Sequence, residues 1–156
     1  MASIEWETPQ DFFAELDKEF HFTLDPCATE ENKKCSQYIT KGVDGLSVSW
    51  VDYSNSVFMN PPYTKDINKW MQKAYEESQN GVLVVCLIQG RSSDTKWWHE
   101  YVMKASEIRY IKNRLHFGIN KKFKRANISS IVVIFKPFCQ GPPKICSIDT
   151  KGQKIR

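Results

Sequence analysis

A chain of 156 residues is long enough for one domain with a buried core and too short for two comfortable ones. Hydrophobic residues make up 41% of the chain and aromatic residues 13%, which excludes an intrinsically disordered protein. The formal net charge of +4 permits a polyanionic partner but fits an ordinary solvated surface equally well.

The expected elements begin with a helix opened by Thr8 and Pro9, a capping hydroxyl and a proline at the first helical position. Apolar residues at helical spacing continue this helix to Phe20. Residues 21–25 are expected to form a strand, and the polar residues 29–38 at most one short helix. A glycine-containing loop at 41–50 leads to a second strand at 57–60.

A second helix is expected from Ile67 to the Asn80-Gly81 pair, which is a typical helix stop. The continuous apolar run at 82–88 predicts a central strand that is buried on both faces. Residues 92–105 then have the pattern of a third helix, and residues 108–111 that of a strand.

The last expected strands are the β-branched run 130–136 and an edge strand at 144–148, followed by a loose basic tail. Strands that alternate with helices predict an α/β sandwich with a largely parallel central sheet. We expect a main domain at 1–138, and an edge strand with the tail at 139–156.

Asn60, Pro61, Pro62 and Tyr63 directly follow an apolar strand, so they are expected at the carboxyl end of the sheet, where such folds bind ligands. The Asn60 side-chain carbonyl and the Pro61 backbone carbonyl can accept hydrogen bonds from an amine or amide and make its nitrogen more nucleophilic. The two prolines fix the backbone, and Tyr63 offers a ring for a planar substrate. A plain Pro-Pro loop with Tyr63 packed in the core is the alternative.

A second motif, Asp25-Pro26-Cys27-Ala28, also follows an expected strand. If the two strands are near neighbours, both motifs face one cleft. Asp25 and the Asp44-Gly45 pair are also common turn formers, so a purely structural role is open for each.

Taken together, the chain from Trp6 to Phe135 resembles the phage-type DNA adenine methyltransferases, which transfer a methyl group from S-adenosylmethionine to the exocyclic amine of adenine. The resemblance is carried by Thr8-Pro9-Gln10, Phe22-Thr23-Leu24-Asp25, Asp44-Gly45-Leu46 with Trp50, Met59-Asn60-Pro61-Pro62-Tyr63, Arg91 with Asp94-Thr95 and Trp98-His99, and Arg114-Leu115-His116-Phe117. It implies a single-domain Rossmann-like methyltransferase sandwich without a large target-recognition domain.

The resemblance also implies a role for each matching residue. Asn60, Pro61, Pro62 and Tyr63 would form the catalytic turn, with Tyr63 stacking on an adenine flipped out of duplex DNA. The cofactor would contact Thr8, Pro9, Asp25, Pro26, Cys27, Ala28, Asp44, Gly45, Leu46 and Asn60. The first loop lacks the glycines common in methyltransferases, and Glu30 or Glu31 is a candidate for the ribose hydroxyls.

Basic residues interleaved with aromatic ones suggest a surface for nucleic acid, with a solvated loop as the alternative. The candidate phosphate contacts are Lys65, Arg91, Arg114, His116, Lys121, Lys122, Lys124 and Arg125. Target reading is expected from the loop at 113–127. His99 is expected to be a packed or surface residue rather than a catalytic one.

The remaining expectations concern context. No apolar run could span a membrane, residues 1–6 do not resemble a signal peptide, and the scattered cysteines and histidines show no metal-ligand spacing. We therefore expect reduced thiols, no metal, no membrane partner and a cytoplasmic protein, in a bacterial host if a phage encodes it. The oligomeric state is open. The alternatives in function are an RNA or protein-glutamine methyltransferase that uses the same motif, and an inactive DNA-binding module.

Overall fold

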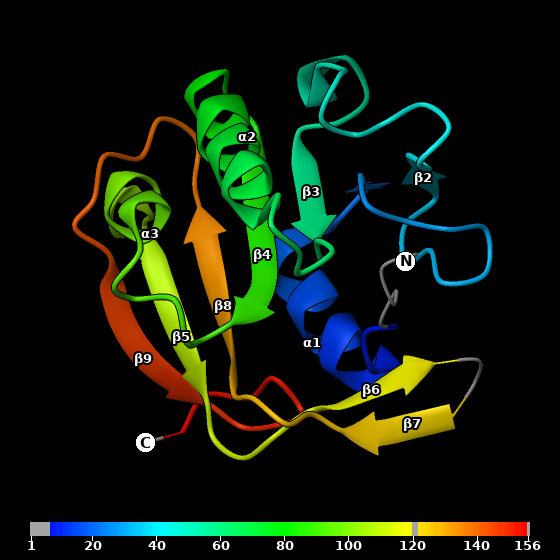
Figure 1. Cartoon of the computed structure of the whole chain (residues 1–156), viewed down its shortest axis with the longest axis vertical. Coiled ribbons are helices and arrows are strands. Elements are labelled where there is room, and N and C mark those ends of the chain that lie inside the picture. Colours follow the sequence, from blue (N-terminus) through cyan, green and yellow to red (C-terminus); the bar gives the residue numbers. More distant parts are fainter. Residues whose placement is uncertain (1–6, 120–121, 156) are drawn as a thin grey trace.

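The computed structural model describes residues 7–119 and 122–155, which form a seven-stranded sheet with helices on both faces and a separate hairpin (Figure 1). The sheet consists of β1 (Leu24–Asp25), β2 (Gln37–Tyr38), β3 (Ser56–Met59), β4 (Leu83–Gln89), β5 (Glu107–Ile111), β8 (Ser130–Phe135) and β9 (Lys144–Ile148). The hairpin consists of β6 (His116–Ile119) and β7 (Lys122–Arg125). The helices are α1 (Gln10–Phe20), α2 (Ile67–Gln79) and α3 (Lys96–Glu100), with 3-10 turns η1 (Trp50–Asp52) and η2 (Val102–Lys104).

The strand order is β2-β1-β3-β4-β8-β5-β9. All neighbouring strands are parallel except at β8, which is antiparallel to both β4 and β5. The prediction of an α/β fold with a mostly parallel sheet is confirmed, and so is the edge strand at β9. The carboxyl ends of β1, β3 and β4 therefore lie at one edge, and the hairpin lies beyond that edge (Figure 1).

Two apolar layers hold the helices on the sheet. One layer joins α1 to the sheet residues that include Phe58, Val85 and Leu87. The other joins α2 and α3 to residues of the opposite face, such as Val84 and Cys86. Because successive residues of a strand point to opposite faces, the apolar run in β4 supplies both layers, as its sequence predicts.

Helix α2 follows its prediction closely. It ends at Gln79, and Gly81 after it has a φ of 95°, a conformation that glycine adopts without steric cost. The start of α1 differs from expectation because Thr8 makes no cap hydrogen bond: Pro9 is the residue before the helix, and the Thr8 hydroxyl is bonded elsewhere.

Two further expectations were wrong, and a third was confirmed only in part. Residues 29–38 form a turn and the short strand β2 instead of a helix, and the expected strand at 21–25 shortens to the two residues of β1. Residues 92–105 do not form one helix, because α3 ends at Glu100 and a separate 3-10 turn follows.

The segment after β9 was expected to be loose but is folded. The Asp149 carboxylate accepts hydrogen bonds from two backbone N–H groups of the following turn, and Lys154 bridges back to Ile148. Gly152 is buried, with α1 close to it at Glu15. Within residues 7–119 and 122–155, none of the helices has the length and apolar character needed to cross a lipid bilayer.

Candidate functional site

A cavity of about 330 Å³ opens where β1, β3 and β4 end. Because β1 and β3 are hydrogen-bonded neighbours, the two motifs that follow them face this one cavity, as expected. It is lined by Pro26, Cys27, Ala28 and Asn32 of the loop after β1, by Ile39, Thr40, Lys41, Asp44 and Gly45 after β2, by Asn60, Pro61, Pro62 and Tyr63 after β3, by Trp70 of α2, by Leu87, Ile88 and Gln89 of β4, and by Phe117, Lys124, Arg125, Ala126, Asn127, Ile128 and Ser130.

Asn60 is held in a defined orientation by the segment before α1. Its side-chain Nδ2 donates a hydrogen bond of 2.9 Å to the hydroxyl Oγ1 of Thr8, which is 2% exposed. With the NH₂ group directed at Thr8, the carbonyl oxygen Oδ1 is the acceptor that the side chain can present to a substrate N–H. The buried Pro61 follows and has no N–H of its own.

Tyr63 is half-buried, and its ring lines the cavity. Its hydroxyl lies 2.6 Å from the Ser92 hydroxyl, and the Arg91 guanidinium lies over its ring at 5.7 Å from the centroid. Burial raises the pKa of Tyr63, against the opposing effects of the Ser92 hydrogen bond and the Arg91 charge, so the neutral phenol is the form present. The ring is fixed from one end and keeps the Arg91 cation close to the cavity.

Asp25 lies directly beneath the loop after β1. One carboxylate oxygen accepts a hydrogen bond from the Cys27 N–H at 3.2 Å and the other from the Lys34 N–H at 3.3 Å. Burial raises the pKa of Asp25 to about 6, although these two hydrogen bonds and the Lys34 charge oppose the rise. Asp25 thus shapes the loop whose residues Pro26 to Ala28 line the cavity, and it is not itself among the lining residues.

Gly45 allows the loop after β2 to lie against the loop after β1. A Cβ atom at this position would approach the Pro26 carbonyl oxygen to 2.3 Å, which no side chain could tolerate. Asp44 before it has a φ of 69°, and its Oδ1 accepts a hydrogen bond from the Leu46 N–H. The close approach brings the Asp44 carboxylate to the cavity wall formed by the two loops.

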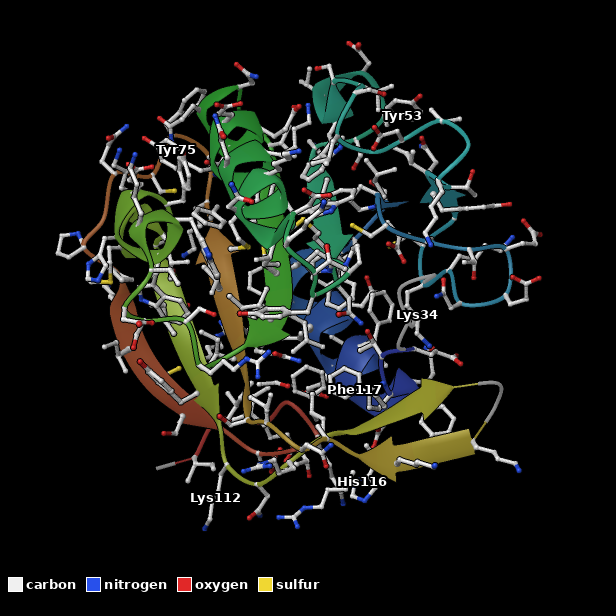
Figure 2. The ribbon with its side chains drawn as sticks, viewed as in Figure 1. Lys34, Tyr53, Tyr75, Lys112, His116 and Phe117 are labelled. Carbon is white, nitrogen blue, oxygen red and sulfur yellow. The ribbon has the colours of Figure 1, made fainter. Side chains whose placement is uncertain are left out.

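The segment expected to be a basic loop is the β6–β7 hairpin. Phe117 is 9% exposed and lies on the side of the hairpin that faces the sheet, whereas His116 lies on the opposite, exposed side (Figure 2). In the facing strand, Lys124 pairs with Phe117 and Arg125 with His116, and both basic residues also line the cavity. The hairpin therefore presents cations where the cavity opens.

Several predicted site residues are not among those lining the cavity. Thr8 contacts Asn60, Leu46 packs against the core, and Pro9 directly precedes α1. Lys65 borders a separate hollow between α2 and α3. Arg91 reaches the cavity only through Tyr63.

The other candidate residues differ in their positions and in their hydrogen-bond partners. Arg114 donates hydrogen bonds to the backbone carbonyls of Ala126 and Asn127, which closes the base of the hairpin. Lys122 is exposed on β7, and Lys121 falls outside the residues that the structure describes. Glu30 is also not among the lining residues: it is bonded to Lys33 and to the Tyr38 hydroxyl. Glu31 is likewise not among them.

Sequence reasoning missed Gln89, the last residue of β4. Its side-chain oxygen Oε1 is buried and accepts no hydrogen bond from residues 7–119 or 122–155, although the residue lines the cavity. A buried acceptor without a donor is unfavourable, so it suits a ligand that brings an N–H or O–H group. The position of a glutamine at the end of the central strand is the signal that could have identified it. Within the same described residues, no cluster of three or more potential metal ligands occurs.

Comparison with known proteins identifies the family. The model of the family described as DNA N-6-adenine-methyltransferase (Dam) matches residues 3–156. A DNA N-6-adenine-methyltransferase of Haemophilus phage HP1 (strain HP1c1) is 30% identical over 138 residues, which cover 85% of this chain and 78% of that protein. One of Escherichia phage T1 is 31% identical over 109 residues, which cover 69% of this chain and 44% of that protein.

The architecture is shared more widely. A crystal structure of a modification subunit of a putative type I restriction enzyme from Vibrio vulnificus YJ016 matches with a TM-score of 0.53 at 12% sequence identity. The match covers 92% of this chain and 47% of that one, and at this identity it concerns the fold alone. The family match extends over nearly the whole chain, and we conclude from it that the chain belongs to the DNA N-6-adenine-methyltransferase (Dam) family.

Proposed function

We propose that this protein transfers a methyl group from S-adenosylmethionine to the N6 amine of adenine in DNA. The proposal is carried by the single cavity that joins the Asn-Pro-Pro-Tyr turn to the two loops after β1 and β2. Membership of the Dam family supports the reaction and its substrate class. We further infer that the sheet and helices form a Rossmann-like methyltransferase sandwich.

The residues around the two loops fit S-adenosylmethionine. A cavity of about 330 Å³ is in the size range of pockets that hold small ligands. Asp44 lines the cavity, and the Asp25 carboxylate lies beneath the loop after β1. Carboxylates accept hydrogen bonds from ammonium and hydroxyl groups. When bound, this cofactor supplies a methyl group on a positively charged sulfur that is a good leaving group.

The turn after β3 makes the target amine more nucleophilic. The Asn60 Oδ1 and the Pro61 carbonyl each accept one N–H of the target amine, which frees the nitrogen lone pair for attack on the methyl carbon. Thr8 keeps the Asn60 amide from rotating, because rotation would break the 2.9 Å hydrogen bond to its hydroxyl. With the cofactor bound, a nitrogen–carbon bond would form as its carbon–sulfur bond breaks, and the methylated amine would lose a proton to water.

The aromatic and basic residues suit a base that leaves the duplex. Tyr63 and Phe117 both line the cavity, so a flipped adenine would find aromatic surface there. Lys124 and Arg125 at the cavity mouth, with His116 and Lys122 on the hairpin, would contact the phosphate backbone. In this arrangement the hairpin, rather than a separate domain, reads the target.

The direct test incubates the protein with duplex DNA and S-adenosylmethionine, digests the DNA to nucleosides and detects N6-methyl-2′-deoxyadenosine by mass. Sequencing then maps the modified sites. Asn60→Ala is expected to abolish product while largely preserving cofactor affinity, because Asn60 acts on the substrate amine. Asn68→Ala is the matched control, since Asn68 lies on the other hollow at α2.

The other outcomes contradict the proposal or one of its parts. Product only on RNA, or only on glutamine of a protein substrate, would show that the turn serves a different amine or amide. Binding of DNA without cofactor binding, measured by titration calorimetry, would identify an inactive DNA-binding module. Near-normal turnover of Asn60→Ala would refute the role of the amide.

A further inference from the structure

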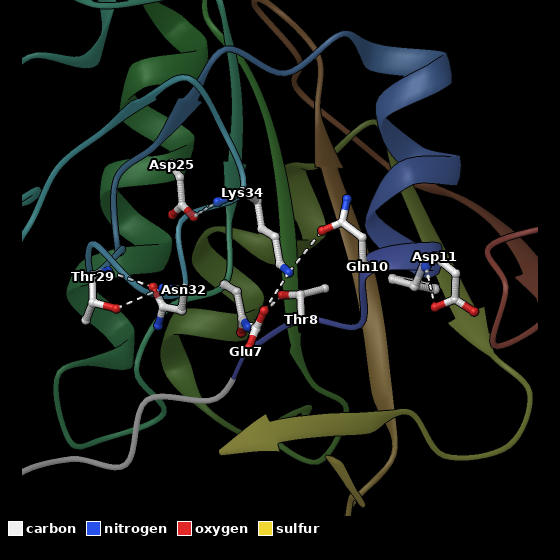
Figure 3. Close-up of polar contacts among 10 residues, drawn as sticks. Glu7, Thr8, Gln10, Asp11, Asp25, Thr29, Asn32 and Lys34 are labelled. Atoms are coloured by element: carbon white, nitrogen blue, oxygen red, sulfur yellow. Dashed lines mark hydrogen bonds and ion pairs between the residues drawn. The ribbon is translucent and has the colours of Figure 1, made fainter. Parts of the chain in front are cut away.

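Lys34 connects parts of the chain that are distant in sequence. Its ammonium Nζ lies 3.1 Å from the Glu7 carboxylate and donates a hydrogen bond of 3.2 Å to Gln10, both from the segment that leads into α1. Its backbone N–H is bonded to Asp25 beneath the loop after β1 (Figure 3). One residue therefore fixes the proposed cofactor loop and the segment 7–10 relative to each other.

The segment 7–10 continues the connection to two other functional parts. The backbone N–H and carbonyl of Glu7 exchange hydrogen bonds of 2.8 and 2.9 Å with Gly118 of β6. The neighbouring Thr8 accepts the hydrogen bond from Asn60. Through Glu7, Thr8 and Gln10, the segment thus contacts the hairpin, the catalytic turn and Lys34.

The Lys34–Glu7 ion pair is less exposed than the neighbouring Lys33–Glu30 pair. The Lys34 side chain is 6% exposed and that of Glu7 28%, whereas the adjacent Lys33–Glu30 pair is exposed at 38% and 67%. Exposed pairs contribute little, but a charge with little access to water depends strongly on its partner. The first pair therefore constrains the chain, and the second offers a control one residue away.

We propose that Lys34 is a positioning residue that couples cofactor binding to DNA binding through the segment 7–10. The inference rests on the proposed function. A ligand that orders the loop after β1 also orders Lys34, and through Glu7 and Thr8 it favours the arrangement of the hairpin and Asn60 that binds DNA. Because such coupling is reciprocal, DNA favours the arrangement of the loop that binds cofactor by the same factor.

The test measures the dissociation constant of S-adenosylhomocysteine, which cannot donate a methyl group, with and without saturating duplex DNA that carries a mapped methylation site. The ratio of the two constants is the coupling factor. For the wild type we expect DNA to tighten binding at least about fivefold, within the usual range of allosteric coupling. Lys34→Met is expected to reduce the factor to about one, Lys34→Arg to retain most of it, and Lys33→Met to leave it unchanged.

If Lys34 has only a structural role, Lys34→Met will lower the thermal midpoint without changing the coupling factor. That outcome would overturn the inference. If Lys34→Met does not fold, Glu7→Gln serves instead, because it removes the charge while the backbone bonds to Gly118 remain. A wild type that methylates DNA with a coupling factor of one refutes the coupling alone. A wild type that binds no S-adenosylhomocysteine refutes the proposed function, and the coupling with it.

Discussion

Protonation of Asp25 is expected to weaken cofactor binding below about pH 6. Burial raises the pKa of this carboxyl from 3.8 to about 6, so ionising it in the free protein costs about 3 kcal/mol more than in water. The protonated form stabilises the free fold fully below about pH 4, and this contribution is lost as the pH rises through 6. The ionised form is the one that a bound cation stabilises.

The size of the effect follows from linkage. If the ammonium group of the cofactor returns the pKa of Asp25 to near 4, affinity at about pH 5 is about tenfold lower than at about pH 7. At about pH 6, binding releases roughly half a proton. The α-amino group of the cofactor stays protonated across this range, so it does not contribute.

Titration calorimetry with S-adenosylhomocysteine at about pH 5, 6 and 7 measures this ratio, and buffers of different ionisation enthalpy measure the released proton. Asp25→Asn is expected to bind weakly at every pH. Asp44→Asn, the control, is expected to lose affinity and keep the tenfold ratio, because Asp25 is intact. Wild-type affinity that is constant from about pH 5 to 7, or an Asp25→Asn variant that keeps the ratio, refutes the reasoning.

The remaining predictions concern the cavity wall and the hairpin. Tyr63→Phe keeps the ring and is expected to cost about 1 kcal/mol of stability with near-normal methylation, whereas Tyr63→Ala is expected to weaken DNA binding. Thermal melts and DNA titrations measure the two effects. If Tyr63 only packs in the core, DNA affinity will not change. Gln89→Met removes a buried acceptor without a donor, so we expect an unchanged or higher thermal midpoint with a lower kcat/KM for DNA; a fall of several degrees would contradict this reading. In Gly118→Ala the new Cβ would lie 2.8 Å from the Phe123 ring, so we expect weaker DNA binding and retained cofactor affinity, which parallel titrations check; unchanged DNA affinity would exclude the hairpin as the contact.

The strongly periodic elements could be predicted from the sequence because local chemistry alone determines them. The apolar face of α2 and its Asn80-Gly81 stop fix that helix, and the apolar β4 and β8 could only be buried strands. The convergence of two motifs on one cavity was also predictable, because parallel neighbours end at the same edge.

The failures have a common physical cause, which is dependence on distant residues. The two residues of β2 have no apolar pattern, and pairing with β1 makes them a strand. Thr8 has the chemistry of a helix cap, but Asn60, 52 positions away, takes its hydroxyl. The hairpin was not predicted because its charged strand β7 is exposed. The sequence predicts no helix between β5 and β8, and this was a signal that the two strands are antiparallel, because parallel neighbours need a crossover connection.

The reversed direction of β8 has a consequence for how such a chain can vary. Residues 112–129 leave β5 and enter β8 at the same rim, because Tyr110 pairs with Ile131 across the two strands. The two ends of this segment therefore lie side by side, and its length does not affect the strand pairing of the seven-stranded sheet. A parallel β8 would have required a crossover across the molecule. Insertions here would change the hairpin, which we propose reads the target, without altering the pairing of the seven-stranded sheet.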